Sequence, residues 1–307
     1  MAHTAALDKG LVVGSFGRHC LVETPEGQRV ICHPRGKKSQ VVVGDRVLWL
    51  PSQDEGTIEK IEERRNLFYR QDEIRTKSFA ANLDQVLILI AAEPEFSESQ
   101  LARALIAAEA ERIRPIIALN KSDLVEPFER AWGRLLPYQH MHYGVLPLCL
   151  RLSGDVDREH LLKHLQGKTT LVLGPSGAGK STLINLLVPG ALAETNEISL
   201  ALNSGKHTTT STTWYWVDDA RTTALIDSPG FQEFGLNHVD PMNLATCMPD
   251  LRVHIEKCKF YNCTHLHEPG CGIMAQVKPA PGPTEISARR YKIYSELFAE
   301  LSQPKRY

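Results

Sequence analysis

The sequence lacks a hydrophobic run long enough to cross a membrane. Its longest apolar run covers only residues 86–92, whereas a membrane-spanning helix needs about 20 apolar residues. Residues 1–9 lack the basic stretch and apolar core of a secretory signal. Together, these two absences predict a cytoplasmic protein without a membrane segment.

The sequence also lacks an excess of either charge, because 35 basic and 36 acidic residues give a formal net charge of −1. Basic residues slightly outnumber acidic ones before residue 80 and after residue 248, but such small excesses do not by themselves indicate nucleic acid. Cysteine is scarce, with seven residues among 307. In a reducing compartment, this number does not indicate a disulfide framework. The length is enough for about two or three compact units.

Residues 10–70 alternate short apolar runs with turn residues. Five short strands favour a small barrel such as an OB-fold, although a β-sandwich fragment would show the same pattern at this length. We therefore predict an N-terminal all-β OB-fold domain over residues 1–75. The expected strands are residues 11–13, 20–23, 29–32, 46–50 and 56–61.

From residue 83 the pattern changes to alternating strands and helices. Repeated strand-helix units predict a doubly wound, mainly parallel α/β sheet with helices on both faces. Residues 214–217 and 222–226 flank a polar turn and predict an antiparallel hairpin. We assign this sheet domain to residues 76–236. Its other expected strands are residues 86–92, 115–119, 146–150 and 169–173, and its expected helices lie around residues 101–106, at 129–138, at 158–165 and from 180 onward.

A complete G-x-x-x-x-G-K-[ST] motif follows the expected strand at 169–173 and opens a helix, which is the context that a phosphate-binding loop requires. Glycines let backbone N–H groups turn toward phosphate oxygens, Lys180 can reach the outer phosphates, and the Ser181 hydroxyl can bind Mg²⁺. An ordinary glycine-rich turn is the alternative, and the full match argues against it. The expected contacts are Gly174, Pro175, Ser176, Gly177, Ala178, Gly179, Lys180, Ser181 and Thr182.

A possible base-reading tetrapeptide, Asn120, Lys121, Ser122 and Asp123, follows the expected strand at 115–119. Guanine presents N1–H and N2–H₂ as adjacent donors, and an ionised Asp123 can accept from both, which would select guanine over adenine. Asn120 can bridge base and protein, and the Lys121 stem can lie along the base plane. Alone, N-K-x-D could be a surface turn. Combined with a phosphate loop, it predicts GTP and GDP as ligands.

The base-reading motif precedes the phosphate loop, whereas Ras-like GTPases have the opposite order. A circular permutation preserves the sheet and the site while it moves the termini, which compact domains tolerate when their ends lie close together. We therefore expect a circularly permuted P-loop GTPase domain. In this order, the loop after Asp227 leads directly into the C-terminal region.

A D-x-x-G motif, from Asp227 to Gly230, follows the expected strand at 222–226. An aspartate at a strand end can hold Mg²⁺, and the Gly230 amide can contact the γ-phosphate, although an isolated D-S-P-G is usually a turn. Upstream of it, Thr209 is favoured over Thr208 as a further Mg²⁺ ligand. A solvated entry to the next strand is the alternative for both threonines.

Phe231 follows D-x-x-G at the position where Ras carries a water-orienting glutamine. A phenylalanine cannot orient water by hydrogen bonding, so hydrolysis requires another group. We expect His207 to be the catalytic residue, because an imidazole can position water or accept its proton near neutral pH. An ordinary structural histidine is an equally good interpretation.

A Cys-x₄-Cys-x-His-x₅-Cys motif lies in an irregular region that ends in a helix expected over residues 287–301. Three thiols and an imidazole suit one structural, tetrahedral Zn²⁺ ion that organises a segment with little core. His267 could replace the first histidine, and a disulfide is an alternative that a reducing compartment disfavours. This predicts a zinc-binding, mainly helical domain over residues 237–307. The expected ligands are Cys258, Cys263, His265 and Cys271.

The barrel pattern, N-K-S-D before G-P-S-G-A-G-K-S, H-T-T, D-S-P-G-F and the Cys/His spacing closely resemble the ribosome small-subunit-dependent GTPase A family over nearly the entire chain. The resemblance implies an OB-fold, a circularly permuted GTPase and a zinc domain. It also implies hydrolysis of GTP to GDP and phosphate, stimulated by the 30S ribosomal subunit during its late maturation. A monomer would contact 16S rRNA through the barrel and the zinc domain.

The resemblance makes several basic residues candidate contacts for rRNA phosphates, although solubilising charge is the commoner interpretation of each. The family usually ends the guanine pocket with a Ser-Ala pair, where this chain has the four residues 151–154 with Ser153 among them. No site is assigned there, and base affinity could be weaker as a result. The candidate phosphate contacts are Arg35, Lys37, Lys38, Arg289, Arg290 and Lys292.

Two other functions fit parts of the sequence. A GTP-dependent switch that recruits a protein partner has the same nucleotide motifs, but it does not explain basic flanks on both sides. A zinc-stabilised RNA-binding protein with a vestigial nucleotide site is disfavoured because Lys180, Ser181 and Asp227 are intact. The predicted function is therefore a GTPase that acts on the small ribosomal subunit.

Overall fold

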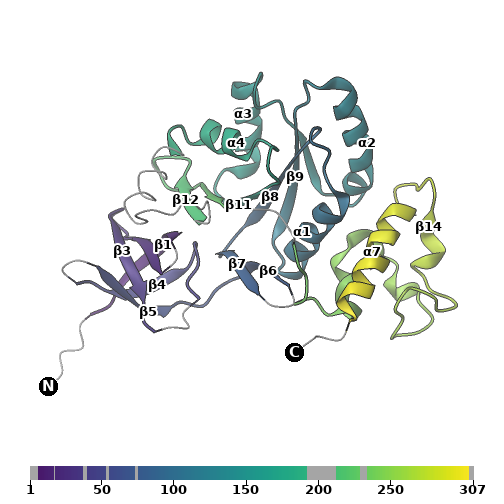
Figure 1. Ribbon diagram of the computed structural model, residues 1–307, viewed down its shortest axis with the longest axis horizontal. Helices are drawn as coiled ribbons and strands as arrows, with labels where there is room; N and C mark the ends of the chain where they lie inside the picture. Colours follow the sequence, from purple (N-terminus) through teal and green to yellow (C-terminus); the bar gives the residue numbers. More distant parts are fainter. Residues whose placement is uncertain are drawn as a thin grey trace.

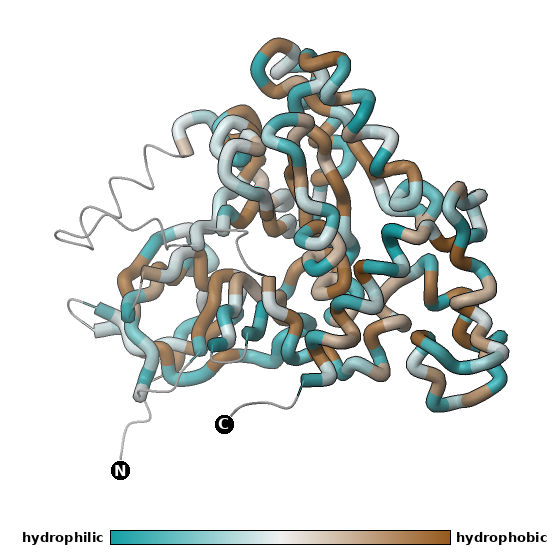
Figure 2. Tube along the Cα trace, turned by 45° about the vertical axis from the view of Figure 1, so that its right-hand side comes forward, coloured by the Kyte–Doolittle hydropathy of each residue, from teal (hydrophilic) through white to brown (hydrophobic). Residues whose placement is uncertain are grey.

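The computed structural model describes residues 6–16, 18–36, 40–52, 55–72, 75–191, 212–228 and 234–303 of the chain. These residues form a small barrel, a central α/β layer and a C-terminal region that follow one another along the longest axis of the molecule (Figure 1). Hydrophobic residues are concentrated along the central strands (Figure 2). No helix within the described ranges is long and apolar enough to span a membrane.

Five strands form the N-terminal barrel in the order β1-β2-β3-β5-β4, and β4 also pairs with β1. The sheet thus closes on itself, as in an OB-fold, around a core that includes Val12, Trp49 and Ile58. All five expected strands are present, and two have the predicted bounds. The strands are β1 (Asp8–Phe16), β2 (His19–Glu23), β3 (Arg29–Pro34), β4 (Arg46–Leu50) and β5 (Gly56–Ile61).

The central sheet has the strand order β10-β9-β8-β11-β13-β12. Its strands pair in parallel, apart from β12, which is antiparallel to β13 and forms the predicted hairpin with it. The expected strand at 146–150 is partly wrong, because β10 ends at Pro147 and the next residues form a loop. The strands are β8 (Gln85–Ala91), β9 (Arg114–Asn120), β10 (Gly144–Pro147), β11 (Thr169–Leu173), β12 (Thr212–Trp216) and β13 (Ala224–Asp227).

Helices cover both faces of this sheet, as predicted. Successive side chains of a strand point to opposite faces, so Ile88 of β8 packs in the core that contains α1 and α2, whereas Leu89 packs in the core that contains α3 and α4. Figure 1 shows the two pairs of helices on either side of the strands. The helices are α1 (Glu98–Ala110), α2 (Val125–His140), α3 (Gly154–Leu165) and α4 (Lys180–Leu187).

The barrel is joined to the central sheet through backbone pairing. Strand β1 pairs antiparallel with β12, in the register Gly14↔Thr213 and Ser15↔Thr212, so one sheet of eleven strands runs through both domains. Beside this joint the buried carboxylate of Glu23 accepts a hydrogen bond from Trp216 Nε1 at 2.8 Å. The barrel is therefore an extension of the central sheet.

A further hairpin, β6 (Leu67–Gln71) with β7 (Thr76–Ala81), lies at the boundary between barrel and sheet and was not expected. It packs Phe68 and Phe79 against Phe234, with ring centroids 5.6 and 5.8 Å from that of Phe234. The expected boundary between residues 75 and 76 falls inside this hairpin. The pattern of strands in the sequence does not show that one hairpin contacts both the barrel and the central layer.

The C-terminal region has short elements and one long helix, α7 (Ala288–Leu301). Its buried residues, such as Ile273, Ile286 and Leu297, continue the core that covers one face of the central sheet. The long helix confirms the closing helix expected at 287–301. The short elements are η1 (Pro241–Cys247), α6 (Pro249–Arg252), η2 (Ile255–Lys257), η3 (Met274–Gln276), β14 (Val277–Lys278) and β15 (Ile286–Ser287).

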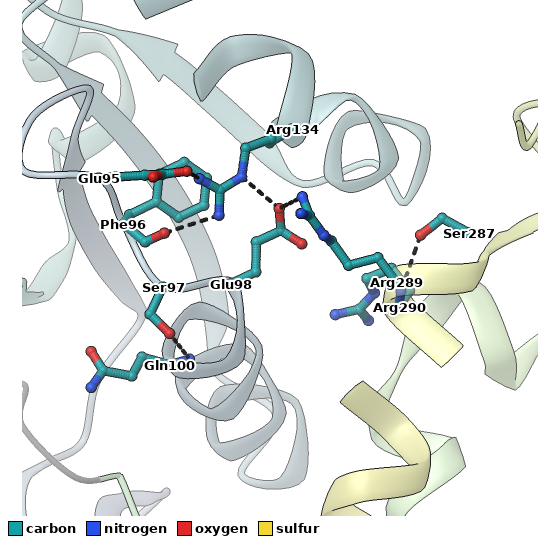
Figure 3. Close-up of polar contacts among 9 residues, drawn as sticks. All are labelled: Glu95, Phe96, Ser97, Glu98, Gln100, Arg134, Ser287, Arg289 and Arg290. Atoms are coloured by element: carbon teal, nitrogen blue, oxygen red, sulfur yellow. Dashed lines mark hydrogen bonds and ion pairs between the residues drawn. The ribbon is translucent and has the colours of Figure 1, made fainter. Parts of the chain in front are cut away.

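An ionic cluster connects α7 to the central layer (Figure 3). The Glu98 carboxylate, at the start of α1 and 8% exposed, accepts from Arg134 Nε of α2 at 2.7 Å and from Arg289 Nη1 of α7 at 2.9 Å. Arg134 also donates to the Phe96 carbonyl at 3.0 Å and lies over the Phe96 ring, 4.3 Å from its centroid. Helix α2 thus holds the loop before α1, and α7 contacts the first residue of α1.

Candidate functional site

The phosphate-loop motif forms the turn between β11 and α4. Gly179 has a φ of +103°, and a Cβ added there would lie 2.5 Å from Asn120 Nδ2. Both facts require glycine at this position, because other residues rarely adopt this φ and their Cβ would clash with Asn120. The tight turn brings residues 174–182 to the carboxyl end of the sheet, where Ser181 and Thr182 are exposed. Ligands in open α/β sheets bind at this edge.

Lys180 and Asp227 lie next to each other at this edge. Their strands are neighbours, with Val172 of β11 opposite Asp227 of β13, and the Lys180 ammonium forms an ion pair with the Asp227 carboxylate. The side chains are 19% and 22% exposed, so both remain accessible. The structure thus brings the phosphate-loop cation and the expected Mg²⁺ ligand together from positions 47 residues apart.

Asn120 connects the base-reading motif to the phosphate loop. Its side chain is 5% exposed, and its Nδ2 donates to the Ala178 carbonyl at 2.9 Å. Its Oδ1 accepts from the Leu150 amide at 3.2 Å. Both ends of the carboxamide are therefore used to hold three loops in one arrangement. A buried amide with all these partners rigidifies its surroundings.

The loop after β10 supports Asp123, and its role was missed from the sequence. Asp123 is exposed, and the Cys149 thiol donates to its Oδ1 at 3.4 Å. The Cys149 amide donates to Asp157 Oδ2 of α3 at 2.7 Å, which fixes the loop. Nothing in the local sequence around Cys149 indicates this contact. In the same loop the Leu152 side chain is 70% exposed.

Lys121 turns the chain at the end of β9, with a φ of +70°. Its ammonium donates to the Glu93 carbonyl in the loop before α1. The next residue of that loop, Pro94, lies beside the phosphate loop, where a Cβ on Gly177 would be 3.5 Å from it. The loop at 93–96 therefore contacts both nucleotide motifs. Three of the predicted site residues, His207, Thr209 and Gly230, lie outside the described residues, as do Thr208 and Phe231.

The four expected metal ligands come together in the C-terminal region, with ligand atoms all within 4.8 Å of one another. Backbone amides of Gly272 and Met274 donate to the sulfur atoms of Cys258 and Cys271 at 3.3 and 3.4 Å. Such N–H···S bonds favour thiolates, which are the form that binds metal. The alternative ligand, His267, is exposed and outside this group. The other ligands are Cys263 and His265.

The environment of these groups fits a zinc ion. Burial lowers the pKa of His265, which favours the neutral imidazole that binds metals. Burial raises the pKa of the Cys263 thiol to about 12, a cost that a bound cation would offset. Helix α7 holds the cluster from outside, because Tyr291 and Tyr294 donate to the carbonyls of His265 and Thr264 at 2.7 and 2.8 Å. A Cys₃His site of this kind is typical of structural zinc.

The candidate phosphate contacts differ in accessibility. Arg290 is wrong as such a contact, because it is 3% exposed and donates to both Asp250 oxygens at 3.0 Å. Arg35 is 74% exposed and pairs with Glu59, and Lys292 is 74% exposed on α7. The Arg289 side chain is 64% exposed and forms an ion pair with Glu98. Lys37 and Lys38 lie outside the described residues.

Comparison with known proteins gives matches over the whole chain. The RsgA GTPase family model matches residues 61–237. A "Small ribosomal subunit biogenesis GTPase RsgA" of Variovorax paradoxus is 76% identical over 299 residues, covering 97% of this chain and 94% of that protein. The protein of the same name from Paraburkholderia phytofirmans is 50% identical, with 96% and 93% covered.

Solved structures match at lower identity. YjeQ from Thermotoga maritima has a TM-score of 0.73 at 27% identity, covering 96% of this chain and 98% of that one. YloQ, described as a circularly permuted GTPase, has a TM-score of 0.71 at 26% identity, with full coverage of both chains. These neighbours and the Cys/His cluster confirm the expected fold class: a circularly permuted GTPase sheet between an OB-fold and a metal-binding region.

Proposed function

This chain belongs to the RsgA GTPase family of GTP hydrolases, and from that membership we propose that it acts in the biogenesis of the small ribosomal subunit. The observation that carries the site assignment is Asn120, whose carboxamide links the base-reading motif to Ala178 of the phosphate loop. One nucleotide placed against both motifs would contact a single rigid unit. Preorganisation of this kind reduces the entropic cost of binding.

We propose these roles at the nucleotide. Asp123 accepts from the N1–H and N2–H₂ groups of guanine, and Cys149 holds one carboxylate oxygen in place. Lys180 neutralises the outer phosphates, while Ser181 and Asp227 hold Mg²⁺, which neutralises charge that develops during phosphoryl transfer. The loop at residues 174–182 supplies backbone donors.

Three further assignments rest on sequence position, since their residues lie outside the described ranges. Thr209 is the further Mg²⁺ ligand, with Thr208 as the alternative, and the Gly230 amide contacts the γ-phosphate. His207 orients the attacking water, because Phe231 cannot do so. A single positioned group of this kind contributes typically about 100-fold or more to a rate.

The flanking regions are proposed to bind RNA. The barrel, residues 1–75, and the metal-binding region, residues 237–307, would contact 16S rRNA of the 30S subunit on either side of the GTPase domain, residues 76–236. The subunit would stimulate hydrolysis of GTP during its late maturation, in the cytoplasm, with the protein acting as a monomer. One Zn²⁺ held by the Cys₃His cluster would stabilise the C-terminal region.

The direct test is GTP turnover by the full-length protein, with and without purified small ribosomal subunits. We expect subunits to raise the rate, Lys180→Ala to lower it by about 100-fold or more, and His207→Ala to lower turnover while leaving GTP affinity intact. Lys163→Ala, on the exposed face of α3, is the matched control and should behave as the unchanged protein. Absence of stimulation would refute the ribosomal role, and equal use of ATP would refute the guanine assignment.

A further inference from the structure

The loop between two of the metal ligands carries two exposed aromatic side chains. Cys258 and Cys263 bracket residues 259–262, in which Phe260 is 41% exposed and Tyr261 is fully exposed, at 102%. Among the large hydrophobic side chains within the described ranges, no other aromatic is exposed. Single exposed apolar residues are ordinary on protein surfaces. Two adjacent aromatics on a short loop are less so, because aromatic rings normally contribute their large area to a core.

The fold does not require Tyr261. A side chain with full exposure buries no area, so it contributes almost nothing to the free energy of unfolding. The tyrosines that do support the metal cluster are Tyr291 and Tyr294, whose hydroxyl groups are hydrogen-bonded to the chain beside it. Tyr261 therefore presents a free ring to solvent, while its neighbours in the same region use theirs for packing.

The loop that carries the ring is held at both ends. The Lys259 amide donates to the Gly270 carbonyl at 3.0 Å, and Cys258 and Cys263 belong to the four-residue ligand cluster. Gly270 has a φ of +76°, with Lys259 Cβ 3.2 Å from the position of an added Cβ, so the two strands of chain lie in close contact. A ring on an anchored loop loses little conformational entropy when it binds a partner.

The charges beside the ring favour an anionic partner. Lys257 and Lys259 are both exposed, and the Lys259 ammonium lies 5.5 Å from the centroid of the Phe260 ring. Glu268, the acid nearest in the ligand loop, is turned inward and accepts from the Thr264 amide and hydroxyl at 2.8 and 2.5 Å. Glu256 is the exposed acid of this segment. An exposed aromatic ring on a loop with exposed lysines next to it in the chain has the chemistry that binds a base and its phosphates.

We propose that the loop at residues 259–262 binds an unpaired base of RNA, with Tyr261 stacked on the base and Lys257 and Lys259 on the adjoining phosphates. This inference rests on the proposed function, because it names the RNA contact of the C-terminal region. It also specifies single-stranded rather than helical RNA, since bases in a duplex present no free face for stacking. A protein partner on the same ring is the alternative that the test must separate.

The first measurement is binding of full-length protein to a single-stranded RNA oligonucleotide of mixed sequence and to a duplex of equal length, by fluorescence anisotropy at fixed salt. Because Tyr261→Ala removes one stacking ring, we expect this variant to bind single-stranded RNA about 5- to 100-fold more weakly. Tyr261→Phe retains the ring and should bind as the unchanged protein does. Met242→Ala removes another exposed side chain and is the matched control. Equal binding by Tyr261→Ala would overturn the proposal.

The second measurement places a photo-crosslinking phenylalanine analogue at position 261 and irradiates the complex with purified small subunits. A crosslink to an rRNA nucleotide supports the proposal, and a crosslink only to a ribosomal protein overturns it. Basal GTP turnover should be equal in every variant, because the loop lies outside the nucleotide site. If subunits fail to stimulate turnover while Tyr261→Ala still loses single-strand binding, the proposed function fails and this inference stands. If subunits stimulate turnover but Tyr261→Ala binds RNA as the unchanged protein does, the proposed function stands and this inference fails.

Discussion

The two regions that flank the GTPase sheet are attached to it by different kinds of contact. The barrel continues the sheet through the backbone ladder between β1 and β12. The C-terminal region is attached through side chains, including the ion pairs Arg289–Glu98 and Arg252–Glu109, and through a shared apolar core. A ladder fixes register, because a slip by one residue turns every side chain to the other face. Ion pairs with exposed partners impose a weaker constraint.

This difference bears on how nucleotide state could reach each region. Strand β12 begins at Thr212, directly after the segment that contains His207 and Thr209, so we expect the barrel to follow any change in that strand. The C-terminal region contacts the first residue of α1 through the ion pair between Arg289 and Glu98. The loop that leads into α1 contacts Lys121 of the base-reading motif. Each region is thus connected to a different part of the nucleotide site.

Removal of the metal should have the largest effect of the three changes, and that effect should be confined to the C-terminal region. A structural zinc contributes on the order of 10 kcal/mol to the folding of the segment that binds it. A zinc chelator should therefore expose the amides of α7 to hydrogen exchange, while those of β1 and β12 keep their protection because their ladder requires no ion. Hydrogen exchange followed by mass spectrometry measures both. Unchanged exchange in α7 after verified loss of zinc would contradict this division.

Glu23→Ala should weaken the attachment of the barrel by about 2–4 kcal/mol in the free energy of unfolding, because it removes a buried carboxylate that accepts hydrogen bonds from two donors. These donors are Trp216 Nε1 at 2.8 Å and Arg29 Nε at 3.0 Å. Urea unfolding followed by tryptophan fluorescence measures the loss. Glu59→Ala is the matched control, since Glu59 pairs with the 74% exposed Arg35 in the same barrel. Equal losses in the two variants would mean that Glu23 makes no special contribution to the joint.

Arg289→Ala should have the smallest effect, below about 1 kcal/mol, because the Arg289 side chain is 64% exposed and Glu98 keeps Arg134 as a partner. The loss should shrink further as salt is added, since exposed ion pairs are screened. Urea unfolding at low and high salt tests this. Lys292→Ala, also on α7 and 74% exposed, is the control and should change nothing measurable. A salt-independent loss of several kcal/mol would show that this joint is as strong as the barrel joint.

Elements with a strong local pattern were predicted well. Strands β4, β5 and β11 have the expected bounds, because each is an apolar run between turn residues. The β6–β7 hairpin was missed, since its burial depends on Phe234, far along the chain. The strand expected at 146–150 was too long because Leu150 is apolar in sequence but donates its amide to Asn120 in a loop. A hydrophobic pattern reports burial, and burial is common to strands and to packed loops.

In the candidate site, too, local motifs were predicted from the sequence and contacts between distant residues were not. By itself the sequence determined which groups this protein offers: the phosphate loop, the guanine-reading tetrapeptide and the Cys/His set, since each is a short motif whose spacing lies within one stretch of chain. Only the tertiary structure decided that Asn120 holds Ala178, 58 residues away, that Cys149 supports Asp123, and that Arg290 is buried on Asp250. Contacts between distant residues depend on how helices and strands pack, and no local spacing encodes that packing.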